Sequence, residues 1–128
     1  ASSKWPLAAR EHDILTGPLE KQYDAIYSLD VMEHIVKESE DVYIDNLRLS
    51  LNPHGVLIVG MPSLESQTYA SPVSKEGHVN CKSGVDLKSV LEKYFLNVFL
   101  FSMNDEVVHT GFTPMAHYLL AVCTEAKA

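Results

Sequence analysis

Short apolar runs alternate with longer polar stretches along this chain, which is the pattern of an α/β protein. Residues Tyr23–Leu29 are apolar apart from Asp24 and Ser28, and they predict a strand buried on both faces. Further strands are predicted at Val56–Val59, Asn97–Met103 and Met115–Thr124. Because the chain must reverse direction between the last two, we expect them to pair antiparallel.

Helical periodicity appears in two segments between these strands. In Ser39–Leu51, apolar residues recur at fourfold spacing, and the turn Asn52-Pro53-His54-Gly55 ends the helix. The second helix follows a capping-box pattern of Ser83 and Asp86 and extends to Phe95. Near the start, Glu11–Leu15 is interpreted as the end of another strand, followed by a turn.

The connection Ser63–Ser83 is long, polar and without clear periodicity. A connection of this length in a compact domain is usually functional or disordered. It leaves the carboxyl end of a predicted strand, where open α/β sheets bind ligands. We therefore predict a substrate lid that is mobile without ligand.

The turn after Tyr23–Leu29 gathers polar residues. Asp30 is predicted to cap a helix, with Glu33 reaching back to the cap. Asp30, Glu33 and His34 would then share one helical face at the sheet edge. This is the first candidate for a ligand site.

Composition narrows the function classes. The 128 residues carry a net charge of −7, with ten lysines and arginines scattered along the chain, so nucleic acid is not an expected partner. No apolar run is long enough to span a bilayer, and no signal peptide is recognised, so we expect a cytoplasmic protein and a small-molecule substrate. The two cysteines, Cys81 and Cys123, are interpreted as reduced thiols.

Two motifs carry a family resemblance. YDAIYSLDVMEHI at Tyr23–Ile35 resembles the fourth strand and following turn of class I S-adenosylmethionine-dependent methyltransferases. LNPHGVLIVGMP at Leu51–Pro62 resembles the turn into the fifth strand of that family, with His54 in place of a glycine. The resemblance implies an incomplete Rossmann-like, doubly wound α/β sheet, mostly parallel with an antiparallel C-terminal strand.

The glycine-rich cofactor loop of the family, G-x-G-x-G, has no counterpart in this chain. Residues 1–128 therefore resemble one partial domain, the C-terminal two-thirds of a methyltransferase. S-adenosylmethionine is the implied cofactor, and the residues assigned to it are Asp13, Ser28, Leu29, Asp30 and His34. For Asp13, a turn-capping carboxylate is an equal alternative.

The spacing D-x-x-E-H with a later histidine is similar to the metal-binding pattern of some O-methyltransferases. It implies a divalent metal held by Asp30, Glu33, His34 and His78. The alternative, which we favour at this point, is that the two carboxylates cap the helix and His34 binds nearby backbone.

Histidines and amides in the strand-end loops supply the remaining candidates. His78, and secondarily His109, are predicted to act as the general base that deprotonates the acceptor. Predicted substrate contacts are Tyr69, Asn80 and Asn104. His12, His54 and His117 are interpreted as turn or strand residues without a catalytic role.

Two functions are consistent with the sequence. The first is methyl transfer from S-adenosylmethionine to a small-molecule oxygen or nitrogen, and the second is a non-catalytic α/β module that pairs with another chain. In either case Tyr23–Leu29 would expose an edge, which we expect to be covered by Trp5–Leu15 or, preferably, by a second copy in a homodimer.

Overall fold

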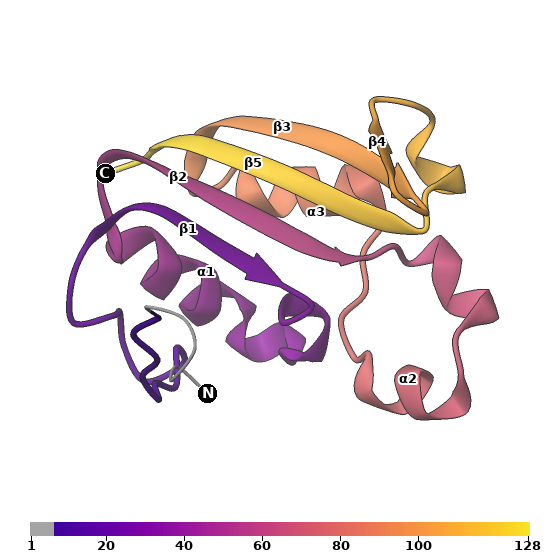
Figure 1. Cartoon of the computed structure of the whole chain (residues 1–128), viewed down its shortest axis with the longest axis horizontal. Coiled ribbons are helices and arrows are strands. Elements are labelled where there is room, and N and C mark those ends of the chain that lie inside the picture. Colours follow the sequence, from indigo (N-terminus) through magenta and orange to yellow (C-terminus); the bar gives the residue numbers. More distant parts are fainter. Residues whose placement is uncertain (1–6) are drawn as a thin grey trace.

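A five-stranded sheet forms the centre of the fold (Figure 1). The computed structural model describes residues 7–128. The strands are β1 (Tyr23–Leu29), β2 (Leu51–Pro62), β3 (Phe95–Asn104), β4 (Val107–His109) and β5 (Tyr118–Ala126), in the spatial order β1-β2-β5-β3-β4. The four predicted strands are confirmed, whereas the short strand β4 was not expected.

The pairing is more antiparallel than predicted. β1 and β2 are parallel, whereas β5 is antiparallel to both β2 and β3, and β4 is antiparallel to β3. The α/β class and the antiparallel C-terminal strand are confirmed. The difference arises because β5 inserts between β2 and β3, so two strands that run in the same direction are not neighbours.

Two helices cover one face of the sheet (Figure 1). They are α1 (Glu40–Leu49) and α3 (Gly84–Leu91). One core cluster joins Ile44 of α1 and Leu87 of α3 to Leu57, Leu119 and other side chains of that face. In residues 7–128 both helices lie on this face, so the doubly wound arrangement expected from the sequence is not seen there.

The expectation that β1 is buried on both faces is wrong. Most of its residues are exposed, because within the described chain β1 pairs with β2 alone and forms an edge. The row Tyr27, Ile58, Val122 and Phe99 runs across the sheet in register. Tyr27 and Phe99 are 76% and 54% exposed, so this row lies on the face without helices.

Element boundaries differ from the sequence prediction at turns. β2 begins at Leu51, so the predicted turn at residues 52–55 lies inside the strand, and Glu11–Leu15 contains no strand. The capping role of Ser83 is confirmed, since its Oγ accepts from the Asp86 amide at 3.2 Å. The helix α3 nevertheless ends at Leu91, and Phe95 starts β3.

The long connection after β2 is more ordered than its sequence suggests. It contains the 3₁₀ helix η3 (Glu65–Tyr69) and the helix α2 (Pro72–Gly77), which begins at a proline behind the capping Ser71. Figure 1 shows this segment extending away from the sheet. None of the helices in residues 7–128 has the length and hydropathy needed to cross a membrane.

Candidate functional site

The turn that follows β1 brings the first site residues together. Asp30 has a positive φ of 58°, a conformation that aspartate tolerates better than most residues. Its amide donates to the carbonyl of Gly60 at 3.0 Å, which ties the turn to the end of β2. The following 3₁₀ helix, η1 (Met32–His34), has no side-chain cap, so the predicted capping box of Asp30 and Glu33 is wrong.

Glu33 is instead buried, with 1% of its surface exposed. Its Oε2 is one of the few buried side-chain oxygens without a hydrogen-bond partner in the described chain. Burial raises the pKa of Glu33, and the nearby His34 opposes that rise in part. A buried carboxylate oxygen without a partner is costly, so the protein maintains Glu33 there at the expense of stability.

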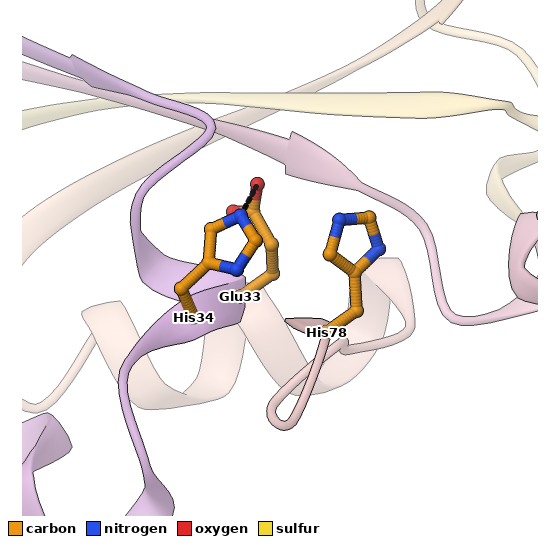
Figure 2. A group of neighbouring side chains, drawn as sticks. All are labelled: Glu33, His34 and His78. Atoms are coloured by element: carbon orange, nitrogen blue, oxygen red, sulfur yellow. Dashed lines mark ion pairs between the residues drawn. The ribbon is translucent and has the colours of Figure 1, made fainter. Parts of the chain in front are cut away.

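Two imidazoles lie next to this carboxylate (Figure 2). His34 Nε2 is 3.8 Å from Glu33 Oε1, and one potential ligand atom from each of Glu33, His34 and His78 lies within 4.8 Å of the others. His34 comes from η1, whereas His78 follows α2. The fold thus joins three of the four predicted metal ligands, while Asp30 lies outside this group.

Hydrogen bonds fix which ring nitrogens carry protons. His34 Nδ1 lies 2.8 Å from the Gly77 carbonyl, and His78 Nδ1 lies 2.8 Å from Gln67 Oε1. Because both oxygens are acceptors, each Nδ1 is the protonated nitrogen and each neutral ring keeps its lone pair on Nε2. Metal-binding histidines are commonly oriented in this way.

The donor set therefore fits a divalent cation. Two Nε2 lone pairs and a buried carboxylate oxygen without a partner are the ligand types that zinc and manganese prefer. The sequence pattern predicted Glu33, His34 and His78 as ligands. It did not predict that Gln67 would bind His78, because the only indication was that both residues lie in the same loop.

A cavity of about 490 Å³ opens beside His78. Its lining residues include no aspartate, glutamate, lysine or arginine: Pro62, Ser66, Gln67, Tyr69, Ala70, Ser74, His78 and His117. Tyr69, a predicted substrate contact, is therefore at the cavity. His117, interpreted from the sequence as a strand residue without a catalytic role, also lines the cavity and immediately precedes β5.

The other two predicted substrate contacts, Asn80 and Asn104, do not line this cavity. The Asn80 side chain is buried and donates to Glu40 Oε1 at 2.9 Å. Asn104 Nδ2 donates to the Met115 carbonyl at 3.1 Å, in the loop after β4.

His109 lies in a different environment from His78. Its Nδ1 accepts from the Gly111 amide at 2.9 Å, and its Nε2 is 3.2 Å from Asn104 Oδ1. Since the lone pair of Nδ1 is already engaged, this arrangement leaves His109 poorly suited to accept a proton from a substrate.

The residues assigned to the cofactor are spread along the edge of β1. Ser28 Oγ shares a hydrogen bond with the Tyr43 hydroxyl, Leu29 ends the strand, and Asp30 and His34 follow in the turn. Asp13 lies in a separate turn, where its Oδ1 accepts from the Leu15 amide at 3.0 Å. That contact is the turn-capping role proposed as the alternative for Asp13.

Tyr118 lies beside the turn after β1, and no sequence pattern predicted this position. A side chain at Gly60 would meet its hydroxyl, because a Cβ there would lie 2.7 Å from that oxygen. The missing side chain of Gly60 thus lets Tyr118 approach the end of β2. Burial and then the neighbouring Asp30 carboxylate raise the pKa of Tyr118, which keeps its hydroxyl protonated.

Comparison with known proteins identifies the fold. The chain matches no protein-family model and no curated protein sequence. Among solved structures it is similar to the N-methyltransferase NodS from Bradyrhizobium japonicum in complex with S-adenosyl-L-homocysteine, at 21% identity and a TM-score of 0.57, over 89% of this chain and 52% of that one.

Two other structures are similar at a TM-score of 0.65. One is a possible histamine N-methyltransferase from Thermotoga maritima, at 16% identity over 84% of this chain and 59% of that one. The other is the methyltransferase domain of bacterial CtHen1-C, at 17% identity over 90% of this chain and 60% of that one.

The chain thus spans between half and two-thirds of the length of these structures. Their identity to it is low, so the similarity establishes architecture and not activity. Residues 7–128 have the Rossmann-like fold of S-adenosylmethionine-dependent methyltransferases over a part of its extent.

Proposed function

We propose that this chain contributes the acceptor side of a methyltransferase site, which transfers a methyl group from S-adenosylmethionine to an oxygen or nitrogen of a small molecule. The observation that carries the proposal is the group Glu33, His34 and His78 beside the cavity that His78 lines, at the carboxyl ends of two parallel strands. Ligands bind at that position in open α/β sheets. The methyltransferase fold of the similar structures supports the same reading.

In this proposal the cavity, Asp30 and His78 have separate roles. The cavity beside His78 holds the acceptor, with Tyr69 on its wall. We assign Asp30, in the turn that follows β1, to the cofactor. His78 has its proton on Nδ1, so Nε2 is the nitrogen that accepts a proton or binds a cation. The protein mainly aligns the nucleophile with the methyl group.

A divalent cation is the second part of the proposal. Glu33, His34 and His78 would hold it, and Asp30 is left out of the ligand set because the structure does not group it with them. When bound, such a cation would lower the pKa of an acceptor hydroxyl. The buried Glu33 Oε2 without a partner supports this assignment.

Calorimetry with S-adenosyl-L-homocysteine tests the proposal. We expect binding to the wild-type chain and at least about tenfold weaker binding to Asp30→Asn, since asparagine keeps the positive φ but loses the charge. Asp86→Asn, an exposed carboxylate on α3, is the matched control. An equal affinity of all three proteins would refute the role of Asp30, and no binding by any of them would refute cofactor binding by this chain.

A second function is favoured by the exposed edge of β1. In residues 7–128 this strand has one neighbour, and the apolar row that begins at Tyr27 on this edge continues across the sheet to Phe99. A non-catalytic module that pairs through β1, in a homodimer with a two-fold axis, would cover that edge. The alternative cover, Trp5–Leu15, lies partly outside the described residues; within them Ile14 packs near α1, where its carbonyl accepts from Asn46 at 2.6 Å.

Sedimentation at micromolar concentration distinguishes these readings. A dimer that does not bind S-adenosyl-L-homocysteine would support the non-catalytic pairing module. A monomer that binds it would support the methyltransferase function. Tyr27→Lys, which charges the edge, is expected to convert a dimer to a monomer without unfolding it, because Tyr27 is largely exposed.

A further inference from the structure

Three buried polar side chains form a network near the candidate site. Lys82 Nζ lies 2.7 Å from Glu40 Oε1, and Asn80 Nδ2 donates to the same oxygen at 2.9 Å. Lys82 Nζ also donates to Asn80 Oδ1 at 3.2 Å. Each of these residues is 5% or 6% exposed. Lysine and glutamate are rarely buried to this extent unless they are paired.

The network joins two parts of the chain that are distant in sequence. Glu40 is the first residue of α1, whereas Asn80 and Lys82 lie in the segment that returns from α2. The Asn80 amide donates to the Glu33 carbonyl at 3.0 Å, and the Leu64 amide donates to the Lys82 carbonyl at 2.9 Å. The return segment is therefore held against the Glu33 turn, and both ends of the long connection are held together.

Hydrophobic contacts do not hold the connection after β2 against the rest of the fold. Within the described chain, the core cluster and the side chains packed on it include no residue between Met61 and Leu87. The outer part of the connection is exposed, with Tyr69 at 87% and Val73 at 81%. Since apolar burial is the usual source of local stability, the connection depends on its polar contacts to an unusual degree.

His78 lies two residues before Asn80, so its position depends on the return segment. We propose that Lys82 and Glu40 are positioning residues, which hold His78 against His34 and Glu33 through Asn80. This inference rests on the proposed function for the importance of that group, but the restraint itself is a property of the fold without ligand.

Paired replacement separates a local restraint from general stability. Removing one member of a buried ion pair leaves an unpaired charge, whereas replacing both by apolar residues of similar size is often neutral for stability. In Glu40→Leu with Lys82→Met, Asn80 loses its partners while the core remains. A second variant, Asn80→Ala, keeps the ion pair but removes the side chain that joins it to position 80, two residues after His78. The control is Arg10→Gln with Glu20→Gln, which removes an exposed pair far from the connection in sequence.

Amide hydrogen exchange of the ligand-free protein is the first measurement. We expect the Asn80 and Leu64 amides to exchange about tenfold faster or more in both test variants, while Leu57 and Ala121 in the central strands keep the wild-type rate. The control should match wild type throughout. Unchanged exchange at Asn80 would overturn the inference, as would equal acceleration at all four amides, since that result indicates global destabilisation.

Mn²⁺ affinity is the second measurement, made at a temperature where all variants are folded. Residues that orient ligands typically contribute 10- to 100-fold to metal affinity, and we expect a loss of about that size in both test variants. Normal affinity together with faster exchange would show that Lys82 and Glu40 do not position His78. If local exchange increases but the wild type binds neither Mn²⁺ nor S-adenosyl-L-homocysteine, the proposed function fails while the restraint on the connection stands.

Discussion

The imidazole rings of His34 and His78 meet edge-on, with their centroids 5.0 Å apart and their planes at 67°. The contact exists because His34 Nδ1 bonds the Gly77 carbonyl next to His78. This contact connects the turn after β1 to the long connection after β2.

Removing the imidazole of His78 should weaken metal binding. We expect Mn²⁺ to raise the melting temperature of the wild-type chain, by an amount that corresponds to about 2.7 kcal/mol at one hundred times its Kd. His78→Ala should bind at least about tenfold more weakly, because one of the three ligands is lost. His109→Ala is the control, since His109 lies in the β4 hairpin. Equal metal content in wild type and His78→Ala would rule out the assignment.

Neutralising Glu33 should stabilise the protein at neutral pH. The pKa of Glu33 is raised by burial, so the folded state binds its proton more tightly than the unfolded state does. Its favourable contribution is therefore present below the ordinary pKa of 4.5 and is lost as pH rises through the higher folded value. Glu33→Gln does not titrate and should gain about 1 kcal/mol over wild type at pH 7, with a smaller gain at pH 4.

Urea unfolding of both proteins at the two pH values measures this difference. Saturating Mn²⁺ should reverse the order at pH 7, since it stabilises the wild type alone. A gain that is the same at pH 4 and pH 7 would mean that the charge on Glu33 is not its cause.

Trypsin should distinguish two lysines in the connection after β2. Lys75 is exposed on α2, whereas Lys82 is 5% exposed and bonded to Glu40. We expect cleavage after Lys75 well before cleavage after Lys82, because proteases need a locally open backbone. Mass spectrometry of early time points identifies the cuts, and Lys75→Gln should remove the first one. Earlier cleavage at Lys82 would contradict the anchored base of this connection.

Glycine at position 54 should stabilise the chain. His54 has a positive φ of 64°, which costs a residue with a side chain about 1 to 2 kcal/mol relative to glycine. Its exposed contact with Glu125, at 3.0 Å, offsets little of that cost. We expect His54→Gly to gain about 0.5 to 1 kcal/mol, measured by thermal or urea unfolding. His54→Ala keeps the strain and loses the contact, so a gain of equal size there would exclude the backbone explanation.

The sequence by itself determined the local elements and the polar turn. Apolar runs and helical spacing located four strands and two helices, because these patterns reflect which face is buried. The D-x-x-E-H spacing indicated Glu33 and His34, which are neighbours in the chain. The resemblance at position 54 was also informative, since a residue that replaces glycine there takes a positive φ.

Tertiary structure decided what is buried and which distant residues meet. β1 has the apolar sequence of a central strand, yet it is an edge in residues 7–128, because burial depends on neighbours that its own sequence does not specify. The sequence around Glu33 is typical of a helix cap, yet the side chain is buried. Lys82 lies in a polar stretch typical of exposed lysines, yet it is buried and pairs with Glu40. Local sequence carries little signal for such contacts, since the energy of a buried charge depends on a partner supplied by another part of the fold.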